Sequence, residues 1–422
     1  MKLTRIKLGD VLDIKRGTSL SGDKYATSGR LIRLTLGNFD YFGGGFKENT
    51  SKENIYYVGS VRNDFIMQKG DIITPLTEQV RGLLGETARI PVSDLYIQSQ
   101  DIGKVIPNES KLDKDFAFYL ISSPIIKYQL DAGSQQTKIR HTSPDKIKEC
   151  IAWIPSLDNQ RKIAKVLDSL NSKILLNKRI IKELESMAKT LYDYWFLQFE
   201  FPNENGKPYK SSGGKMVWNE ELKREIPEGW KVDNLIESSL CEDIKAGVDY
   251  FETKNYLPTA NINGEEITDG DYIKFNNRES RANMQPVKNS VWFAKMKNSI
   301  KHLTIPENSD WFISKYILST GFQGLKCSAD SLAYIHCIIN SNWFEVYKNM
   351  LSHGATQESV NNEDLKNIKF AVPSVDVLKR FSAILFPILE KKFSIIKENQ
   401  ELTALRDFLL PLLMNGQVTF KE

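Results

Sequence analysis

Residues 154–196 read IPSLDNQRKIAKVLDSLNSKILLNKRIIKELESMAKTLYDYWF, and this stretch decides the fold of the chain. From Ile163 to Leu191 its apolar residues recur with the alternating spacing of four and three that is typical of a helix packed against a second helix. Pro155 ends the preceding strand, and Asp158 can cap the start of the helix. A helix over this stretch would be about 55–60 Å long, which exceeds the width of a small domain.

A second long helix is predicted from Val375 to Met414, with a less regular apolar pattern. Asn177 in the first helix and Asn399 in the second fall on or near the apolar seam, where a buried asparagine can fix the register of a helix pair; the alternative is that both face solvent. The two helices most simply pair antiparallel, because one globular segment lies between them in the chain. The predicted coiled-coil seam consists of Ile163, Leu167, Leu170, Ile174, Asn177, Ile181, Leu184, Leu191, Leu385, Ile388, Ile395, Leu402 and Leu409.

The rest of the chain repeats itself around these helices. Three pairs of segments match in the same order and at nearly one offset: IKRG at 14–17 with IKAG at 244–247, GSQQTKI at 133–139 with GATQESV at 354–360, and IPSL at 154–157 with VPSV at 372–375. Several matches in one order are hard to obtain by chance. The chain therefore consists of domain A, a long helix, domain B and a second long helix.

We predict an α+β fold, in which two mainly β domains are joined by two long helices that form an antiparallel coiled coil. Short alternating runs between Gly, Pro and Asn turns predict strands in both domains, while Lys114–Leu130 and Ser341–Leu351 fit helices best. The predicted boundaries are 1–154 for domain A, 155–200 for the first long helix, 201–229 for a linker, 230–372 for domain B and 373–422 for the second long helix.

The overall charge permits nucleic-acid binding without requiring it, since 57 Lys and Arg stand against 53 Asp and Glu. Basic and amide side chains instead gather in corresponding loops of the two domains. Lys and Arg neutralise phosphates, and Arg, Asn and Gln suit base edges in the major groove. The predicted DNA-binding residues are Lys15, Arg16, Asn38, Arg81, Gln136, Lys138, Arg140, Lys245, Asn263, Arg278, Arg281, Lys295, Lys297 and Gln357.

Sequence patterns for catalysis are missing. There is no Walker A loop and no Asn/Asp-Pro-Pro-Tyr tetrapeptide of amino-methyltransferases. The four histidines have no triad spacing, and the four cysteines form no CxxC pair. We therefore predict no catalytic residue and no metal site. The apolar run Phe408–Met414 is far shorter than the roughly 20 residues that cross a bilayer, so the chain is expected to be soluble and cytoplasmic, without a membrane partner.

Together these features resemble the specificity subunits of type I restriction–modification systems, over nearly the whole chain. The resemblance rests on the two Gly-x-x-Gln loops that lead through Ile-Pro-Ser or Val-Pro-Ser into the long helices. It also rests on three segments of the central region: YDYWF at 192–196, NGKPYKSSGGKM at 205–216 and IPEGW at 226–230.

The resemblance implies two target recognition domains, each of which reads one half of a bipartite, asymmetric site in double-stranded DNA. It implies that the long helices act as a spacer and dock two modification (methyltransferase) subunits, which restriction (translocase and nuclease) subunits then join. The chain itself would be a non-catalytic subunit that binds no cofactor. S-adenosylmethionine, ATP and Mg would be bound by its partners.

Two other classes of function stay open at this point. The chain could be a stand-alone DNA methyltransferase or nuclease with an unrecognised active site, which would transfer methyl groups or cleave DNA without partners. It could also be a coiled-coil scaffold that holds other proteins, which would not bind DNA even when methyltransferase subunits are supplied.

Overall fold

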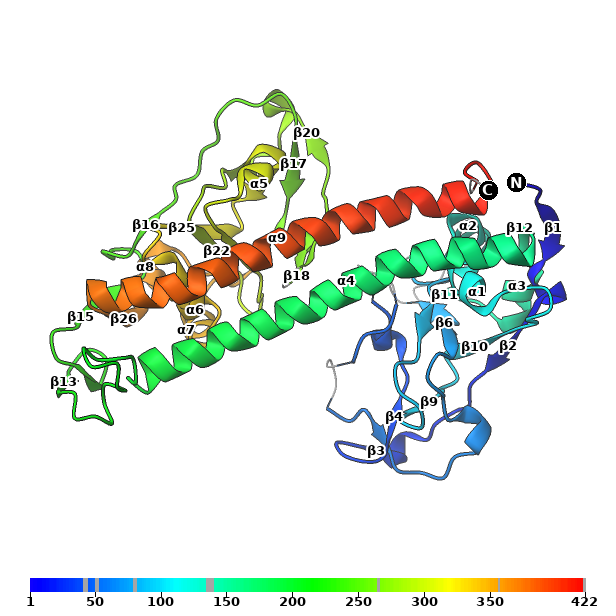
Figure 1. Ribbon diagram of the computed structural model, residues 1–422, viewed down its shortest axis with the longest axis horizontal. Helices are drawn as coiled ribbons and strands as arrows, with labels where there is room; N and C mark the ends of the chain where they lie inside the picture. Colours follow the sequence, from blue (N-terminus) through cyan, green and yellow to red (C-terminus); the bar gives the residue numbers. More distant parts are fainter. Residues whose placement is uncertain are drawn as a thin grey trace. The chain divides into compact units, whose positions relative to one another are not determined.

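Two long helices dominate the computed structural model (Figure 1), which describes residues 1–40, 45–49, 53–78, 82–133, 140–263, 266–355 and 357–419. Helix α4 spans Leu157–Tyr192 and passes into a π-helical turn at Asp193–Leu197, while α9 spans Val375–Met414 as predicted. The chain divides into two compact units. Unit 1 comprises Met1–Ile174 and Leu402–Glu422, and unit 2 comprises Leu175–Glu401, so that each long helix contributes to both units.

Unit 1 contains two four-stranded sheets. The first has the order β2 (Leu12–Arg16), β10 (Ile102–Pro107), β6 (Ile72–Pro75) and β8 (Ala88–Arg89), with every pair antiparallel. The second has the order β3 (Tyr25–Ala26), β5 (Tyr56–Tyr57), β4 (Leu31–Arg33) and β9 (Tyr96–Ile97), with β4 and β9 parallel. Two-stranded pairs are formed by β1 (Thr4–Lys7) with β12 (Ile151–Ile154), and by β7 (Thr77–Glu78) with β11 (Arg140–His141).

Three short helices complete unit 1: α1 (Lys114–Ile121), α2 (Pro124–Ala132) and α3 (Pro144–Glu149). The single helix predicted over Lys114–Leu130 is wrong, because the chain breaks at Ser122 and restarts with Pro124 in the first turn of α2. Proline lacks the amide proton that an uninterrupted helix needs at this point, but it is well suited to a first helical turn.

Unit 2 repeats the strand order of the first sheet and three of the four strands of the second. One sheet has the order β16 (Cys241–Asp243), β25 (Phe322–Cys327), β22 (Ser290–Ala294) and β23 (His302–Ile305), all antiparallel. The other has the order β20 (Tyr272–Ile273), β17 (Lys254–Leu257), β24 (Tyr316–Ser319) and β21 (Ala282–Met284), with β17 and β24 parallel. The remaining elements are β15 (Lys231–Asn234) with β26 (Lys369–Val372), β18 (Ile262–Asn263) with β19 (Glu266–Ile267), α5 (Asp310–Lys315), α6 (Leu332–Ile339), α7 (Asn342–Leu351) and α8 (Asn362–Leu365).

The correspondence between the units extends to their ends. In each unit an early strand pairs antiparallel with the last strand before a long helix, β1 with β12 and β15 with β26. In the first sheet, strand β10 of unit 1 and the corresponding strand β25 of unit 2 are each followed by two helices, α1 and α2 in unit 1 and α6 and α7 in unit 2. The repeat predicted from the sequence offsets is therefore a repeat of topology.

The segment 201–229, predicted as a linker, is folded into unit 2. It contains the hairpin of β13 (Met216–Asn219) and β14 (Arg224–Pro227). Phe201 is buried, and its ring stacks on Tyr209 at 4.6 Å and on Trp230 at 5.3 Å between ring centroids. Polar composition predicted a loose connection here, but three aromatic side chains bury the segment against the core.

Much of the predicted coiled-coil seam packs into the cores of the two units. Ile163 and Leu167 are fully buried in the core of unit 1, together with Phe116 and Leu8. In unit 2, Ile181 and Ile395 share a core with strand residues, and Leu385 lies in the aromatic core around Phe381 and Phe196. Ile174 is also buried, whereas the predicted seam residues Leu170, Leu184, Leu191, Ile388, Leu402 and Leu409 are half-buried. The sheets and short helices therefore cover apolar positions that the heptad pattern assigned to the partner helix.

Polar contacts join α4 to α9 within unit 2. Asn177 is 1% exposed, and its side-chain amide donates to Asn399 Oδ1 at 2.9 Å and to Glu398 Oε2 at 2.8 Å. Further along α4, Glu185 forms an ion pair of 2.8 Å with Lys392. As residue numbers rise in α4 they fall in α9, so the two segments run in opposite directions where they touch. Asn177 does not face solvent.

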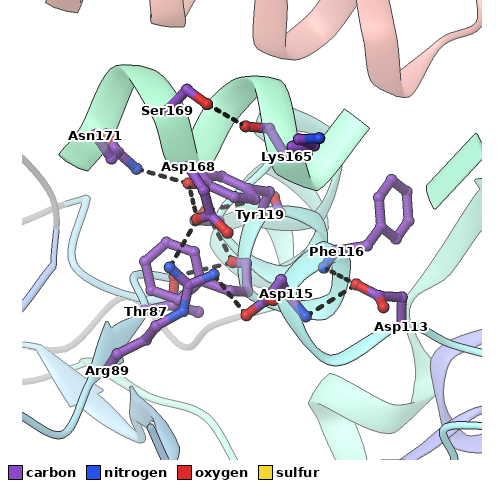
Figure 2. A network of polar contacts seen from close by, with 12 residues as sticks. Thr87, Arg89, Asp113, Asp115, Phe116, Tyr119, Lys165, Asp168, Ser169 and Asn171 are labelled. Atoms are coloured by element: carbon purple, nitrogen blue, oxygen red, sulfur yellow. Dashed lines mark hydrogen bonds and ion pairs between the residues drawn. The ribbon is translucent and has the colours of Figure 1, made fainter. Parts of the chain in front are cut away.

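A second polar network fixes α4 to domain A within unit 1 (Figure 2). The Arg89 guanidinium on β8 forms ion pairs of 2.8 Å with Asp168 on α4 and 3.1 Å with Asp115 on α1. The Tyr119 hydroxyl donates to Asp168 Oδ1 at 2.6 Å and accepts from the Asn171 amide at 2.9 Å. Burial, together with the hydrogen bond to Asp168, raises the pKa of Tyr119. No helix among the described residues is long and apolar enough to cross a membrane.

Candidate nucleic-acid interface

The first cluster of predicted DNA-binding residues lies at the end of β2 in domain A. Lys15 forms an ion pair of 2.8 Å with Asp64, and the Arg16 Nε donates to the Gln100 carbonyl at 2.9 Å. Gly17, which follows them, approaches Ser99 so closely that a Cβ atom would lie 2.1 Å from the Ser99 carbonyl oxygen. The glycine of the Ile-Lys-x-Gly motif is thus required by close packing.

Several loops of domain A meet at this end of the sheet. The Thr18 amide donates to the Gln98 carbonyl at 3.3 Å, beside the end of β9. The Leu76 amide, after β6, donates to the Asp101 carbonyl at 2.8 Å, and its own carbonyl accepts from Thr142 at 2.9 Å. Segments from four parts of the sequence are thereby brought to one place, and two of them lie close in sequence to the predicted contacts Arg16 and Arg140.

Asn38 does not belong to this surface. It is 1% exposed, its Oδ1 accepts from the Thr35 amide at 2.9 Å, and its Nδ2 donates to the Lys47 carbonyl at 3.2 Å. The side chain closes a short 3-10 turn at Leu36–Asn38, and its burial keeps it from contacting DNA. We withdraw Asn38 from the candidate contacts, because an amide that suits adenine equally suits a backbone turn.

Arg140 also serves the fold of domain A. Its guanidinium forms ion pairs with Glu78 Oε1 at 3.0 Å and with Asp131 Oδ1 at 2.5 Å, and its side chain is 16% exposed. Glu78 is 2% exposed, and its other oxygen accepts from the amides of residues 82, 83 and 84 at 2.9–3.0 Å. Arg140 thus neutralises a buried carboxylate. The predicted contacts Arg81, Gln136 and Lys138 lie outside the described residues.

In domain B, backbone hydrogen bonds bring the corresponding loops together. The Gly247 amide donates to the Asn283 carbonyl at 2.8 Å, and Gly247 has a φ of +150°, a conformation that favours glycine. The Thr320 amide donates to the Arg281 carbonyl at 2.8 Å. Gly321, the residue after Thr320, accepts a hydrogen bond on its carbonyl from the Lys295 amide at 2.9 Å. The predicted residues Lys245, Arg281, Lys295 and Lys297 therefore belong to loops that meet at one end of the domain.

Asp243 organises the charges of this region. It forms an ion pair of 2.5 Å with Lys245, and its carboxylate accepts from the amides of Gln323 and Asn362. Partial burial lowers the pKa of Lys295, and the nearby Asp243 charge opposes that shift. The Asp243 side chain is 7% exposed whereas that of Lys245 is 80% exposed, so the carboxylate faces inward and the ammonium faces solvent. Sequence reasoning missed Asp243, although it lies two residues before Lys245 in the repeated motif.

A buried charge network supports the loop that carries Lys295 and Lys297. The Lys348 side chain is 0% exposed, and its Nζ donates to the carbonyls of Ala294 and Ser299 at 3.2 and 2.9 Å and pairs with Glu345 at 2.8 Å. Glu345 also contacts His302 Nε2 at 2.8 Å. Burial acts to raise the pKa of Glu345, but the hydrogen bonds from His302 and Lys348 outweigh it and lower that pKa. The network fixes both ends of the loop, and sequence reasoning did not find it.

Arg278 and Arg281 differ in how firmly they are held. The Arg278 guanidinium lies 4.1 Å from the centroid of the Phe275 ring and donates to the Phe275 carbonyl at 2.8 Å. Arg281 is exposed, and no described residue forms an ion pair or hydrogen bond with its side chain. The ring of Tyr250, which is 73% exposed, has its centroid 5.4 Å from that of Phe275. Exposed aromatic rings interleaved with arginine are suited to nucleic acid.

The remaining predicted contacts are surface residues with protein partners. Lys297 forms an ion pair of 2.9 Å with Glu358, and the Gln357 amide lies 3.2 Å from the Met296 sulfur. Asn263 accepts from Lys301 Nζ at 3.2 Å. Within the described part of the chain, no group of three or more His, Cys, Asp or Glu residues is placed to hold a metal ion. The arrangement offers ammonium, guanidinium and amide donors, which can bind phosphates and base edges.

Comparison with protein-family models finds a match in the first part of the chain. Residues 2–186 match the type I restriction modification DNA specificity domain. This segment covers domain A and most of α4, and therefore includes the loops that meet at the end of β2.

Two curated proteins are similar over much more of the chain. The type I restriction enzyme MjaIX specificity subunit of Methanocaldococcus jannaschii is 24% identical over 404 residues, which cover 91% of this chain and 89% of the relative. The type I restriction enzyme HindI specificity subunit of Haemophilus influenzae is 23% identical, over 77% of this chain and 82% of the relative.

A solved structure shares the fold. The crystal structure of the type I restriction-modification system S subunit from M. genitalium matches with a TM-score of 0.57 and 15% sequence identity, and the match covers 100% of this chain and 97% of that chain. At this identity the similarity concerns the fold alone.

Proposed function

This chain is similar to the specificity subunits of type I restriction–modification systems along most of its length, as its motifs indicated, and we propose that it reads a bipartite, asymmetric DNA site with one half-site per domain. The similarity to named specificity subunits also confirms the prediction that the chain is a non-catalytic subunit of an enzyme complex. The finer statements below are our proposal.

One observation carries the proposal: the strand order of the first sheet occurs twice, and in both copies basic loops meet at the end of this sheet. The loops differ in sequence between the copies, with Lys15 and Arg16 in domain A and Lys245, Lys295 and Lys297 in domain B. Domains with the same fold but different contact residues read different bases. An asymmetric site follows from this difference.

Among the predicted contacts, we propose a division between phosphate and base readers. Lys15, Lys245 and Lys297 each have a partly or largely exposed side chain whose ammonium group pairs with one carboxylate, which suits a phosphate contact. Arg281 is exposed and its guanidinium has no partner among the described residues, which suits the bidentate recognition of guanine. Arg81, Gln136, Lys138, Asn263 and Gln357 stay predicted contacts.

We propose that α4 and α9 form the spacer between the target recognition domains and the dock for partner subunits. The antiparallel order of their contacts in unit 2 supports a helix pair, and the buried Asn177–Asn399 hydrogen bond supports a fixed register. Two modification subunits would bind there, and restriction subunits would join them. These partners would supply S-adenosylmethionine, ATP and Mg. The predicted domain boundaries stay part of this proposal.

Arg281→Ala tests the assignment of the DNA surface in the assembled complex with modification subunits. We expect DNA affinity to fall about 5- to 150-fold with relaxed preference at one base pair, because a lost bidentate contact costs about 1–3 kcal/mol. Binding to DNA fragments that carry every base at each site position gives both quantities. Unchanged affinity and unchanged base preference would remove domain B's arginine loop from the interface.

The same assay separates the alternatives. Methyl transfer or DNA cleavage by the purified chain alone would make it an enzyme, and loss of all DNA binding even with modification subunits present would make it a protein scaffold. The proposal predicts neither outcome.

A further inference from the structure

Unit 2 contains a groove that the proposed DNA-reading role does not use. It has a volume of about 710 Å³ and lies among the end of α4, the β13–β14 hairpin, the start of α7 and strand β26. Pockets that bind ligands have volumes of about 300–1,000 Å³. The question is what chemistry this groove is built to receive.

The corresponding place in unit 1 is closed by a side chain. Gln129 is the sixth residue after Ser123, the N-cap of α2, and Ile151 is the first residue of β12. The Ile151 amide donates to Gln129 Oε1 at 2.8 Å, and the Gln129 Nε2 donates to the Ile151 carbonyl at 2.9 Å. One carboxamide thus satisfies the donor and the acceptor on the outer edge of β12, as a neighbouring strand would do.

Unit 2 lacks this closure. The sixth residue after Ser341, the N-cap of α7, is Tyr347, and the first residue of β26 is Lys369. The Leu235 amide donates to the Ile368 carbonyl, so the even-numbered residues of β26 form the backbone bonds to β15. Because successive residues of a strand direct their backbone groups to opposite sides, Lys369 directs its amide and carbonyl toward the groove. No described residue forms a hydrogen bond with either group. The repeat therefore leaves open in unit 2 a pair of backbone groups that unit 1 fills with a carboxamide.

Apolar side chains line the groove beside this open edge. Trp343 and Tyr347 of α7 are 38% and 41% exposed, and their ring centroids are 5.0 Å apart. Leu197, at the end of α4, is 49% exposed. In unit 1 the residue that corresponds to Trp343 is Ile125, which packs against the core. Exposed aromatic residues that gather around a groove are typical of binding surfaces.

Among the charged side chains that line the groove, one cation has no carboxylate partner in the described part of the chain. Each acidic residue of the lining has a cationic partner: Asp193 pairs with Lys189 at 2.5 Å, Glu221 with Lys369 at 2.7 Å, and Glu185 with Lys392, which lies outside the lining, at 2.8 Å. Arg224 also lines the groove, stacks on Phe199 at 4.6 Å and donates to the Leu197 carbonyl at 3.2 Å. No described carboxylate pairs with it. The groove is therefore complementary to a ligand that carries a negative charge.

We propose that this groove binds an extended, acidic segment of a partner polypeptide. The segment pairs its backbone with Lys369 on the edge of β26, places an apolar side chain against Trp343, Tyr347 and Leu197, and places a carboxylate on Arg224. Addition of a strand to an open edge is a recurrent mode of peptide recognition, in which backbone bonds give affinity and side-chain contacts give specificity. The proposal stands independently of the DNA-reading role.

A peptide titration of the full chain tests the proposal, with Ac-Leu-Asp-Leu-Asp-Leu-NH2 as the probe and two peptides as controls, one with Lys in place of Asp and one with a methylated central amide nitrogen. We expect the acidic peptide to bind about tenfold more tightly than either control, because each control removes one charge-assisted or backbone bond. Amide hydrogen exchange at Lys369 should slow when the peptide binds. Equal affinities of the acidic and basic peptides would overturn the proposal.

Two variants locate the binding. Tyr347→Gln introduces the carboxamide of unit 1 and should lower peptide affinity about tenfold by occupying Lys369, whereas Tyr128→Gln, at an exposed tyrosine of α2, should leave it unchanged. Arg224→Ala should abolish the preference for the acidic peptide, with Arg30→Ala as the matched control. Full affinity in both groove variants, with unaltered thermal unfolding, would contradict the site; if Tyr347→Gln fails to fold, the Arg224→Ala result decides.

Discussion

The two domains each have an ion pair at the same place in their topology. The acidic and basic residues have exchanged positions between the two pairs, and one pair is buried whereas the other is exposed. In domain A, Glu78 on β7 pairs at 3.0 Å with Arg140 on the neighbouring strand β11, and their side chains are 2% and 16% exposed. In domain B the corresponding partners are Lys297 and Glu358, which are 2.9 Å apart and 34% and 48% exposed. Domain A thus uses its ion pair as part of the fold, whereas domain B leaves a lysine at the surface.

The difference teaches how one topology supports different binding surfaces. A buried carboxylate must be paired, and removal of its partner leaves an uncompensated charge. An exposed ion pair contributes little to stability, since solvent and salt screen it. The exposed position can therefore change its residues without loss of the fold, and the buried position cannot. We expect variation in DNA recognition to use exposed loop positions such as Lys297.

The largest expected effect breaks the buried pair. Glu78→Ala leaves Arg140 without one carboxylate and three backbone amides without an acceptor, so the free energy of unfolding should fall by about 3–5 kcal/mol. The matched change in domain B, Glu358→Ala, should cost less than about 1 kcal/mol. Urea unfolding of both variants measures the two values. Similar losses in the two variants would show that burial does not distinguish the pairs.

An intermediate effect concerns DNA. Lys297→Ala should lower DNA affinity of the assembled complex about 3- to 10-fold and reduce the salt dependence by about one released counterion, because one phosphate contact is lost. Lys326→Ala serves as the control, since Lys326 is exposed on β25 toward the opposite end of the strand. Titrations at several salt concentrations give both quantities, and equal salt slopes for wild type and Lys297→Ala would exclude a phosphate contact.

The smallest effect is a pH dependence of the loop of domain B that carries Lys297. The hydrogen bonds from His302 and Lys348 lower the pKa of Glu345 below the usual glutamate value of 4.5. The stabilisation is therefore complete above about pH 4.5 and is lost as the pH falls through the lowered, folded-state pKa. Amide hydrogen exchange of residues 295–301 should accelerate in that acidic range for the wild type. Glu345→Gln should flatten the pH profile, and an unaltered profile in this variant would assign the acid response to another group.

Periodicity and repetition predicted the parts of the fold that depend on local sequence. The bounds of α9 agree with the prediction, and α4 ends near the predicted Phe196 by way of a π-helical turn. The predicted helix over Lys114–Leu130 failed because helical periodicity passed across Ser122 and concealed the restart at Pro124. Local patterns thus specified where helices lie but not every interruption.

The candidate site was less predictable, because it depends on partners distant in the sequence. Nothing near Asn38 in the chain indicates that its amide is used by Thr35 and Lys47, and nothing near Arg140 identifies Glu78 as its partner. The basic residues of domain B were found from the loop correspondence, while Asp243 and the Glu345–Lys348 network, which position those loops, were not. Composition identifies which residues can bind DNA, but only packing decides which of them are free to do so.

The most direct test of the central claim is to map the methylated adenines of DNA modified by the assembled complex, before and after residues 230–372 are replaced by the corresponding segment of a relative with another specificity. The account predicts that one half of the recognised site changes while the other half stays the same. A change in both halves, or in neither, would contradict the claim that each domain reads its own half-site.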